Sequence, residues 1–298
     1  MSKLKTILIL IIVLWIISSI TSNFIGNVNQ FGFNKIAVIP INGIISSTES
    51  GFFESGTIPN DIIESLKKAD KDNSVKGIIL EINSPGGTFV ASEQIANAVK
   101  QTEKPVVALI TELGASGAYL VASSADLIIA DRASITGSIG VTSSYLEFSG
   151  LLEKFGVDYE RLVAGKYKDI GSPLKDLNVE ERNLFEKKLN KLHGFFIEEI
   201  SINRNLPEEK VRELATGIFY LGIEAKDLGL VDLLGDKELA INEVKKLANI
   251  EEATLIKFEK RKTFLDLLTG VSAHSSYYFG QGFGKSFLNF NNKFEIIA

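Results

Sequence analysis

Residues 75–110 have the sequence VKGIILEINSPGGTFVASEQIANAVKQTEKPVVALI, and the alternation within this stretch indicates the fold class. The runs at 75–82 and 104–110 are short, apolar and rich in β-branched residues, as buried strands are. Between them, residues 88–101 have apolar residues at helical spacing. A strand, a helix and a second strand in this order form a right-handed crossover between parallel strands.

The same alternation continues on both sides of this unit. The remaining expected elements are strands at 35–45 and 127–130 and helices at 59–72, after Gly114, at 178–205 and at 237–248. Asn60 or Asp61 is expected to cap the first of these helices. Strands that alternate with helices predict an α/β fold with a mainly parallel sheet, whose active groups lie at the carboxyl ends of the strands. The stretches NSPGG and GASGA both fall at such ends.

Composition and charge narrow the functional classes. The net charge of -5 argues against a protein that binds nucleic acid through a general basic face. The absence of cysteine excludes disulfides, cysteine-based zinc sites and a cysteine nucleophile. No metal or other cofactor is expected, because no His/Asp/Glu cluster has metal-ligand spacing. The stretch GQGFGKS at 280–286 is no phosphate loop, since its glycine spacing is too short and no strand precedes it.

An apolar segment near the N-terminus predicts a membrane anchor. No charged residue occurs from Thr6 to Ser22, and this length is near the lower limit for a membrane-spanning helix. Lys3 and Lys5 precede the segment, which favours a cytoplasmic N-terminus and a body outside the cytoplasm. A cleaved signal peptide is the alternative, although the small residues after the apolar run form only a weak cleavage site.

Ser116 lies at the junction of a predicted strand and helix, in the stretch LGASGAYLVASSADLIIA at 113–130. A serine hydroxyl becomes a good nucleophile only when a neighbouring base removes its proton. His193 falls within a long predicted helix and is interpreted as structural, and His274 falls in the C-terminal tail. A lysine held out of water is the alternative base, because burial disfavours the charged amine. Composition alone does not select that lysine.

Five short motifs, in order and in register, resemble the signal peptide peptidase A family. They are LEINSPGG at 80–87, GASGAY at 114–119, GSIGV at 137–141, GKYKDIGSP at 165–173 and GIFYLGIEAKDLGLVDLLGD at 217–236. The resemblance spans about residues 36–247 and implies a Clp protease/crotonase-like spiral of βαβ units with serine peptidase activity that is independent of ATP. The expected organisation is an anchor at 1–22, a linker at 23–34, a peptidase domain at 35–250 and a tail of undetermined structure at 251–298.

The resemblance implies catalytic roles for three residues. Ser116 matches the nucleophile of a Ser-Lys dyad, Lys168 matches the general base, and Ser138 matches a hydroxyl that supports the lysine. A turn cap is the alternative interpretation of Ser138. The sequence departs from many relatives at Ala118, where they have a second glycine, and this methyl group is expected to narrow the substrate groove slightly.

Gly87 and Gly117 match the backbone donors of an oxyanion hole in this family. Acyl transfer places negative charge on the carbonyl oxygen, and backbone N–H groups stabilise it best where no Cβ hinders approach. A larger residue at Gly87 is therefore expected to reduce turnover far more than folding stability. The alternative is that Gly86 and Gly87 only form a turn after Pro85.

These expectations combine into a membrane-anchored serine endopeptidase that faces away from the cytoplasm. It would degrade apolar peptides such as remnant signal peptides, and the resemblance implies a homo-oligomer in which neighbouring subunits share active sites. One alternative is the related membrane serine peptidase that cleaves stomatin-type partners. A crotonase-like acyl-CoA enzyme is another, although it needs neither a Ser-Lys pair nor an anchor. A scaffold without activity would leave Ser116, Lys168 and Ser138 unexplained.

Overall fold

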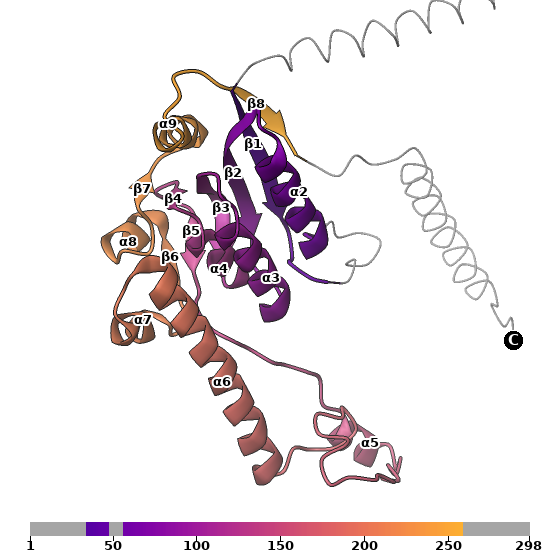
Figure 1. Ribbon diagram of the computed structural model, residues 1–298. Helices are drawn as coiled ribbons and strands as arrows, with labels where there is room; N and C mark the ends of the chain where they lie inside the picture. The colour runs from indigo at the N-terminus through magenta and orange to yellow at the C-terminus, as the bar shows by residue number, and fades with distance from the viewer. Residues whose placement is uncertain (1–33, 48–55, 259–298) are drawn as a thin grey trace, which may run out of the picture.

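The computed structural model describes residues 34–47 and 56–258 (Figure 1). Its strands are β1 (Lys35–Asn42), β2 (Val75–Ser84), β3 (Val106–Ala115), β4 (Leu127–Ala130), β5 (Ile135–Gly137), β6 (Phe219–Leu221), β7 (Leu233–Leu234) and β8 (Thr254–Lys257). Its helices are α2 (Pro59–Lys71), α3 (Phe89–Lys100), α4 (Gly117–Ser123), α5 (Ser149–Lys154), α6 (Val179–Arg204), α7 (Glu208–Leu214), α8 (Gly222–Asp227) and α9 (Lys237–Leu247).

The described strands form one sheet that is parallel except at one edge. Its order is β6-β5-β3-β2-β1-β8, and β4 pairs with both β3 and β7. β1, β2 and β3 pair in parallel, which confirms the crossover predicted from residues 75–110. The antiparallel pair of β5 and β6 was not predicted, because each of these strands has only three residues.

Both faces of the sheet are buried, which explains why its strands are almost continuously apolar. In β1, Ile39 and Ile41 point to the face covered by α2, α3, α4 and α6. Ile36 and Val38 point to the opposite face and belong to a second core cluster, which includes Val244 of α9. Successive side chains of a strand alternate between faces, so one strand contributes to two core layers.

The long helix α6 joins the sheet to a segment that projects away from it. Its start is held by a capping box, in which Asn178 and Glu181 each accept a hydrogen bond from the other's backbone. Its C-terminal half packs on the core through Phe196, Ile197 and Ile200. The N-terminal half extends beyond the sheet, and Figure 1 shows α5 and its neighbouring loops at this far end.

Two expectations about boundaries differ from the structure. The residue that caps α2 is Ile58, with no side-chain hydrogen bond, because Pro59 in the first turn already sets the backbone angle of a helix start. Residues 254–257, which fall in the predicted C-terminal tail, form β8 and pair in parallel with β1. The sheet therefore continues past residue 250.

The predicted anchor at 1–22, the linker up to residue 33, His274 and the GQGFGKS stretch lie outside the described residues. Among the helices in the described ranges, none is both long enough and apolar enough to cross a membrane. Those ranges also contain no group of His, Asp and Glu side chains that could hold a metal ion. The membrane anchor stays a prediction.

Candidate active site

Ser116 occupies a strained turn between β3 and α4. Its backbone angles are φ 53° and ψ -126°, a combination that non-glycine residues rarely adopt. Its N–H donates to the Gly137 carbonyl at 2.8 Å, and its carbonyl accepts from the Leu120 N–H at 3.1 Å. All seven residues of α4 are buried. The packing holds the turn in place, and strain of this kind, which costs about 1–3 kcal/mol, is typical of functional sites.

Ser138 lies beside Ser116 because of the sheet register. The end of β3 pairs with β5, and Ala115 faces Gly137, so the next residue of each strand leaves the sheet at the same place. Ser138 also has a positive φ, 50°. Its N–H donates to the Ile218 carbonyl at 3.0 Å, and its hydroxyl donates to the Gly217 carbonyl at 3.1 Å. The two serines therefore leave adjacent strands on fixed backbones.

A cavity of about 380 Å³ opens beside these two serines. Its walls come from the loop after β5, from one face of α6 and from the loop before β6. The residues that line it include Ser116, Ser138, Val141, Leu189, His193 and Thr216. Hydroxyl groups, an imidazole and aliphatic side chains thus share one concave surface, as in sites that bind a substrate side chain.

The glycines of the NSPGG turn lie directly against Ser116. A Cβ on Gly86 would lie 2.6 Å from the Gly117 nitrogen, and a Cβ on Gly117 would lie 3.3 Å from the Gly87 nitrogen. Among the described residues, neither the Gly87 N–H nor the Gly117 N–H donates to an acceptor. Two unpaired backbone donors beside a serine are the arrangement that stabilises a tetrahedral oxyanion. Gly86 has φ +94°, a left-handed backbone conformation that glycine adopts without strain.

Lys168 lies elsewhere in the same chain. It belongs to the projecting segment between α5 and α6, at the end of α6 away from the sheet. Its side chain is exposed, and it does not line the cavity beside Ser116. The fold of one chain therefore brings Ser116, Ser138, Gly87 and Gly117 together but leaves Lys168 apart.

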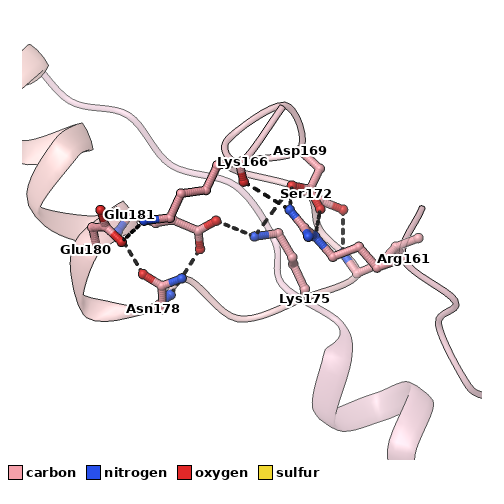
Figure 2. A network of polar contacts seen from close by, with 9 residues as sticks. Arg161, Lys166, Asp169, Ser172, Lys175, Asn178, Glu180 and Glu181 are labelled. Atoms are coloured by element: carbon pink, nitrogen blue, oxygen red, sulfur yellow. Dashed lines mark hydrogen bonds and ion pairs between the residues drawn. The ribbon is translucent and has the colours of Figure 1, made fainter. Parts of the chain in front are cut away.

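The neighbours of Lys168 are anchored by ion pairs (Figure 2). The Arg161 guanidinium binds both carboxylate oxygens of Asp169, at 2.6 and 2.7 Å, and also donates to the Lys166 carbonyl at 3.1 Å. These hydrogen bonds hold the pKa of Asp169 below its usual value. Glu180 of α6 accepts hydrogen bonds from the side chains of Lys166, at 2.6 Å, and of Tyr167.

A second part of the network ties this segment to the start of α6. Lys175 lies 2.6 Å from the buried Glu181 and 3.9 Å from Asp169. The Lys175 hydrogen bond lowers the pKa of Glu181, which also takes part in the capping box with Asn178. The bidentate contact of Arg161 with Asp169 fixes the relative position of the two side chains as well as pairing their charges. Within KYKD, three side chains are anchored, whereas the side chain of Lys168 has no hydrogen bond or ion pair among the described residues.

Comparison with protein families identifies the class to which this site belongs. The sequence model of peptidase family S49 matches residues 98–251, more than half of the chain and a range that includes Ser116, Ser138 and Lys168. The chain belongs to peptidase family S49. The Clp protease model matches residues 54–138, which include both glycines beside Ser116.

Three sequence relatives of this S49 peptidase are themselves named as proteases or peptidases. A Methanocaldococcus jannaschii protein, provisionally named a protease, is 37% identical over 87% of this chain and 83% of its own. An Enterococcus faecium protein, provisionally named signal peptide peptidase SppA, is 35% identical over 77% of this chain and 68% of its own. The chloroplastic serine protease SPPA of Arabidopsis thaliana is 32% identical over 81% of this chain but only 37% of its own. The protein is a serine peptidase, and the resemblance inferred from its motifs is confirmed.

Gly87 has a packing role in this S49 peptidase that the sequence did not indicate. A Cβ at this position would lie 1.8 Å from the Ile45 carbonyl oxygen, because Ile45 and Gly87 form a parallel bridge. A larger residue at Gly87 is therefore expected to lower folding stability as well as turnover. The backbone of another loop occupies the space that a side chain needs.

Replacing Gly87 with alanine is expected to lower the free energy of unfolding by about 1–3 kcal/mol, the usual cost of overpacking. The matched control is Gly150→Ala, because a Cβ on Gly150 in α5 would meet no atom within 4 Å. Thermal denaturation of the two variants measures the difference. Equal thermal denaturation midpoints for Gly87→Ala and Gly150→Ala would show that the loop containing Ile45 accommodates the added methyl group without loss of stability.

One residue that lines the cavity was not predicted to lie there from the sequence. His193 lies on α6, as predicted, but its side chain lines the cavity that contains Ser116. Leu189, one helical turn earlier, lines the same cavity. The spacing of these two residues places them on one face of the helix, yet nothing in the sequence indicates that this face meets the end of β3.

Proposed function

We propose that this S49 peptidase is a membrane-anchored endopeptidase in which Ser116 is the nucleophile and Lys168, from a neighbouring copy, is the general base. This proposal rests on two features of the chain considered together. The site around Ser116 lacks a general base, and the side chain of Lys168 has no hydrogen bond or ion pair among the described residues. Ser116 has a fixed turn and two free backbone donors, but the described residues that line its cavity include no lysine. Lys168 is exposed on an anchored segment that projects from the same chain.

The surface around α5 supports assembly of several copies. Large apolar side chains are exposed along it, including Leu146 and Phe155 at 73% and Leu162 at 86%. Others on the same segment are Phe148, Leu151, Val157 and Tyr159. Soluble proteins rarely expose so many apolar groups on one element unless they meet another molecule. A second copy would cover this surface and bring Lys168 to the neighbouring Ser116.

The proposed reaction follows from the groups in the site. The neutral Lys168 amine takes the Ser116 hydroxyl proton while Oγ forms a bond to the peptide carbonyl carbon. The N–H groups of Gly87 and Gly117 then stabilise the oxyanion. When the tetrahedral intermediate collapses, the C–N bond breaks and the lysine proton moves to the leaving amine. Water hydrolyses the acyl-enzyme by the same steps. The Ser138 hydroxyl, on its fixed backbone, would accept a hydrogen bond from the lysine.

The proposed substrates are peptides with apolar segments, including remnants of cleaved signal peptides, and the proposed location is a cell membrane with the N-terminus in the cytoplasm. The apolar run at 6–22 and the name of the Enterococcus faecium relative support this choice. Cleavage of stomatin-type partners is the alternative from the sequence. Competition between a synthetic signal peptide and a stomatin-derived peptide, at equal concentration, distinguishes the two.

A membrane-impermeant fluorophosphonate probe tests both the nucleophile and the orientation. Added to intact spheroplasts that carry the full-length protein, it should label the wild type and leave Ser116→Ala unlabelled, because only an activated serine reacts. Labelling that appears only after lysis would place the catalytic domain in the cytoplasm. Equal labelling of the wild type and Ser116→Ala would exclude Ser116 as the nucleophile.

A further inference from the structure

A buried serine contacts the turn that carries the proposed nucleophile. Ser92 lies near the start of α3, and none of its surface is exposed. A Cβ built on Gly117 would lie 2.2 Å from the Ser92 Oγ and 3.0 Å from the Ser92 Cβ. The Ser92 hydroxyl therefore occupies the space that a side chain at position 117 would need, and it contacts the glycine backbone directly.

The same hydroxyl is tied to the NSPGG segment. Helix α3 begins just after this segment, with Thr88 as its N-cap. The Thr88 carbonyl accepts hydrogen bonds from the Ser92 hydroxyl and from the Ser92 N–H, both at 3.1 Å. The Thr88 N–H donates to the Ile45 carbonyl at 3.0 Å. Ser92 is thus fixed relative to the residue that follows Gly87, and it also touches Gly117.

We propose that the Ser92 hydroxyl is a positioning group, which sets the separation between the N–H donors of Gly87 and Gly117. Ser92 is fully buried, so it acts through these glycines and not on the substrate. The strained backbone of Ser116 needs such support, because a strained turn persists only where its surroundings hold it. The inference rests on the proposed function, since it takes the two N–H groups as the oxyanion hole.

The expected consequence is a loss of transition-state stabilisation without a loss of substrate binding. Both donors must lie at hydrogen-bond distance from the oxyanion, and removing one donor lowers kcat by about 10²–10³-fold. Removal of the Ser92 hydroxyl displaces a donor without deleting it, so a smaller effect follows. Folding stability should change little, because the Thr88 carbonyl keeps its bond from the Ser92 N–H and alanine is a strong helix former.

Ser92→Ala in the full-length protein tests the proposal. We expect kcat for a quenched fluorescent peptide to fall on the order of tenfold, with KM unchanged. The inhibition constant of a peptide aldehyde should rise by the same factor, because the oxygen of its adduct with Ser116 occupies the oxyanion hole. The midpoint of thermal denaturation should move by less than about 4 °C.

The matched control is Ser65→Ala. The Ser65 hydroxyl donates to the Asp61 carbonyl at 2.8 Å, four residues earlier in α2, as Ser92 does in α3. This variant loses the same kind of hydrogen bond on another helix. It should therefore keep the wild-type kcat, KM and inhibition constant.

A second substitution tests the contact itself. Gly117→Ala places a methyl group against the Ser92 Oγ and should lower kcat. In the double variant of Ser92→Ala and Gly117→Ala, that methyl group takes the place of the missing hydroxyl. The double variant should therefore be more active than Gly117→Ala alone, although its two Cβ atoms still need a small shift from 3.0 Å.

Four results would overturn the inference: an unchanged kcat in Ser92→Ala, a fall in kcat without weaker aldehyde binding, an equal fall in Ser65→Ala, or a double variant no more active than Gly117→Ala. Failure of the proposed function is distinguishable from these. It would appear as peptide cleavage by Ser116→Ala at the wild-type rate.

Discussion

Lys168→Arg protein is expected to fold and assemble like wild type and to lose peptide cleavage by on the order of 10⁴-fold or more, a loss typical of removing one member of a catalytic unit. Arginine keeps the positive charge and nearly the same length, but its guanidinium stays protonated and cannot accept the proton of Ser116. The measurement is the turnover of a quenched fluorescent peptide, with size-exclusion chromatography to confirm assembly.

The matched control is Lys166→Arg, two residues away. Lys166 binds Glu180 at 2.6 Å, and an arginine can keep this ion pair, so this variant should cleave at nearly the wild-type rate. The double variant Ser116→Ala with Lys168→Ala should be no less active than either single variant, because the two residues act as one unit. Cleavage by Lys168→Arg at a rate near wild type would show that another group is the base.

Mixing two inactive variants is expected to restore cleavage. If one copy provides Ser116 and its neighbour provides Lys168, an assembly of Ser116→Ala and Lys168→Ala chains contains some complete sites. For equal amounts and random assembly through one head-to-tail interface, about a quarter of the sites are complete. Co-expression with two different affinity tags, followed by tandem purification and the peptide assay, measures this recovery.

The corresponding control replaces Lys168→Ala in the mixture with the double variant of Ser116 and Lys168, which provides neither group. That mixture should stay inactive at every ratio. Absence of recovery in the first mixture, with both tags present in one assembly, would mean that a single chain provides both residues after a movement of the projecting segment. The exposed position of Lys168 makes the shared site the expected outcome.

The parts of the fold that could be predicted are those with a strong local signal. β1, β2, β3 and the helices between them have long apolar runs or clear helical spacing, and the structure has them close to the expected bounds. The adjacency of NSPGG and Ser116 followed as well, because parallel strands place their carboxyl ends at one edge of the sheet. The three-residue strands β5 and β6 could not be predicted, since their pairing depends on contacts between distant segments.

The sequence by itself determined the fold class, the peptidase family and the place of Ser116 at a strand-to-helix turn, because periodicity and short motifs are local properties of the chain. The tertiary structure alone decided that Ser138 lies beside Ser116, that His193 lines their cavity and that Lys168 does not line it. These facts depend on strand register, on the direction in which α6 leaves the sheet and on the ion pairs around Arg161 and Asp169. Each joins residues that are distant in sequence, so no local pattern reveals it.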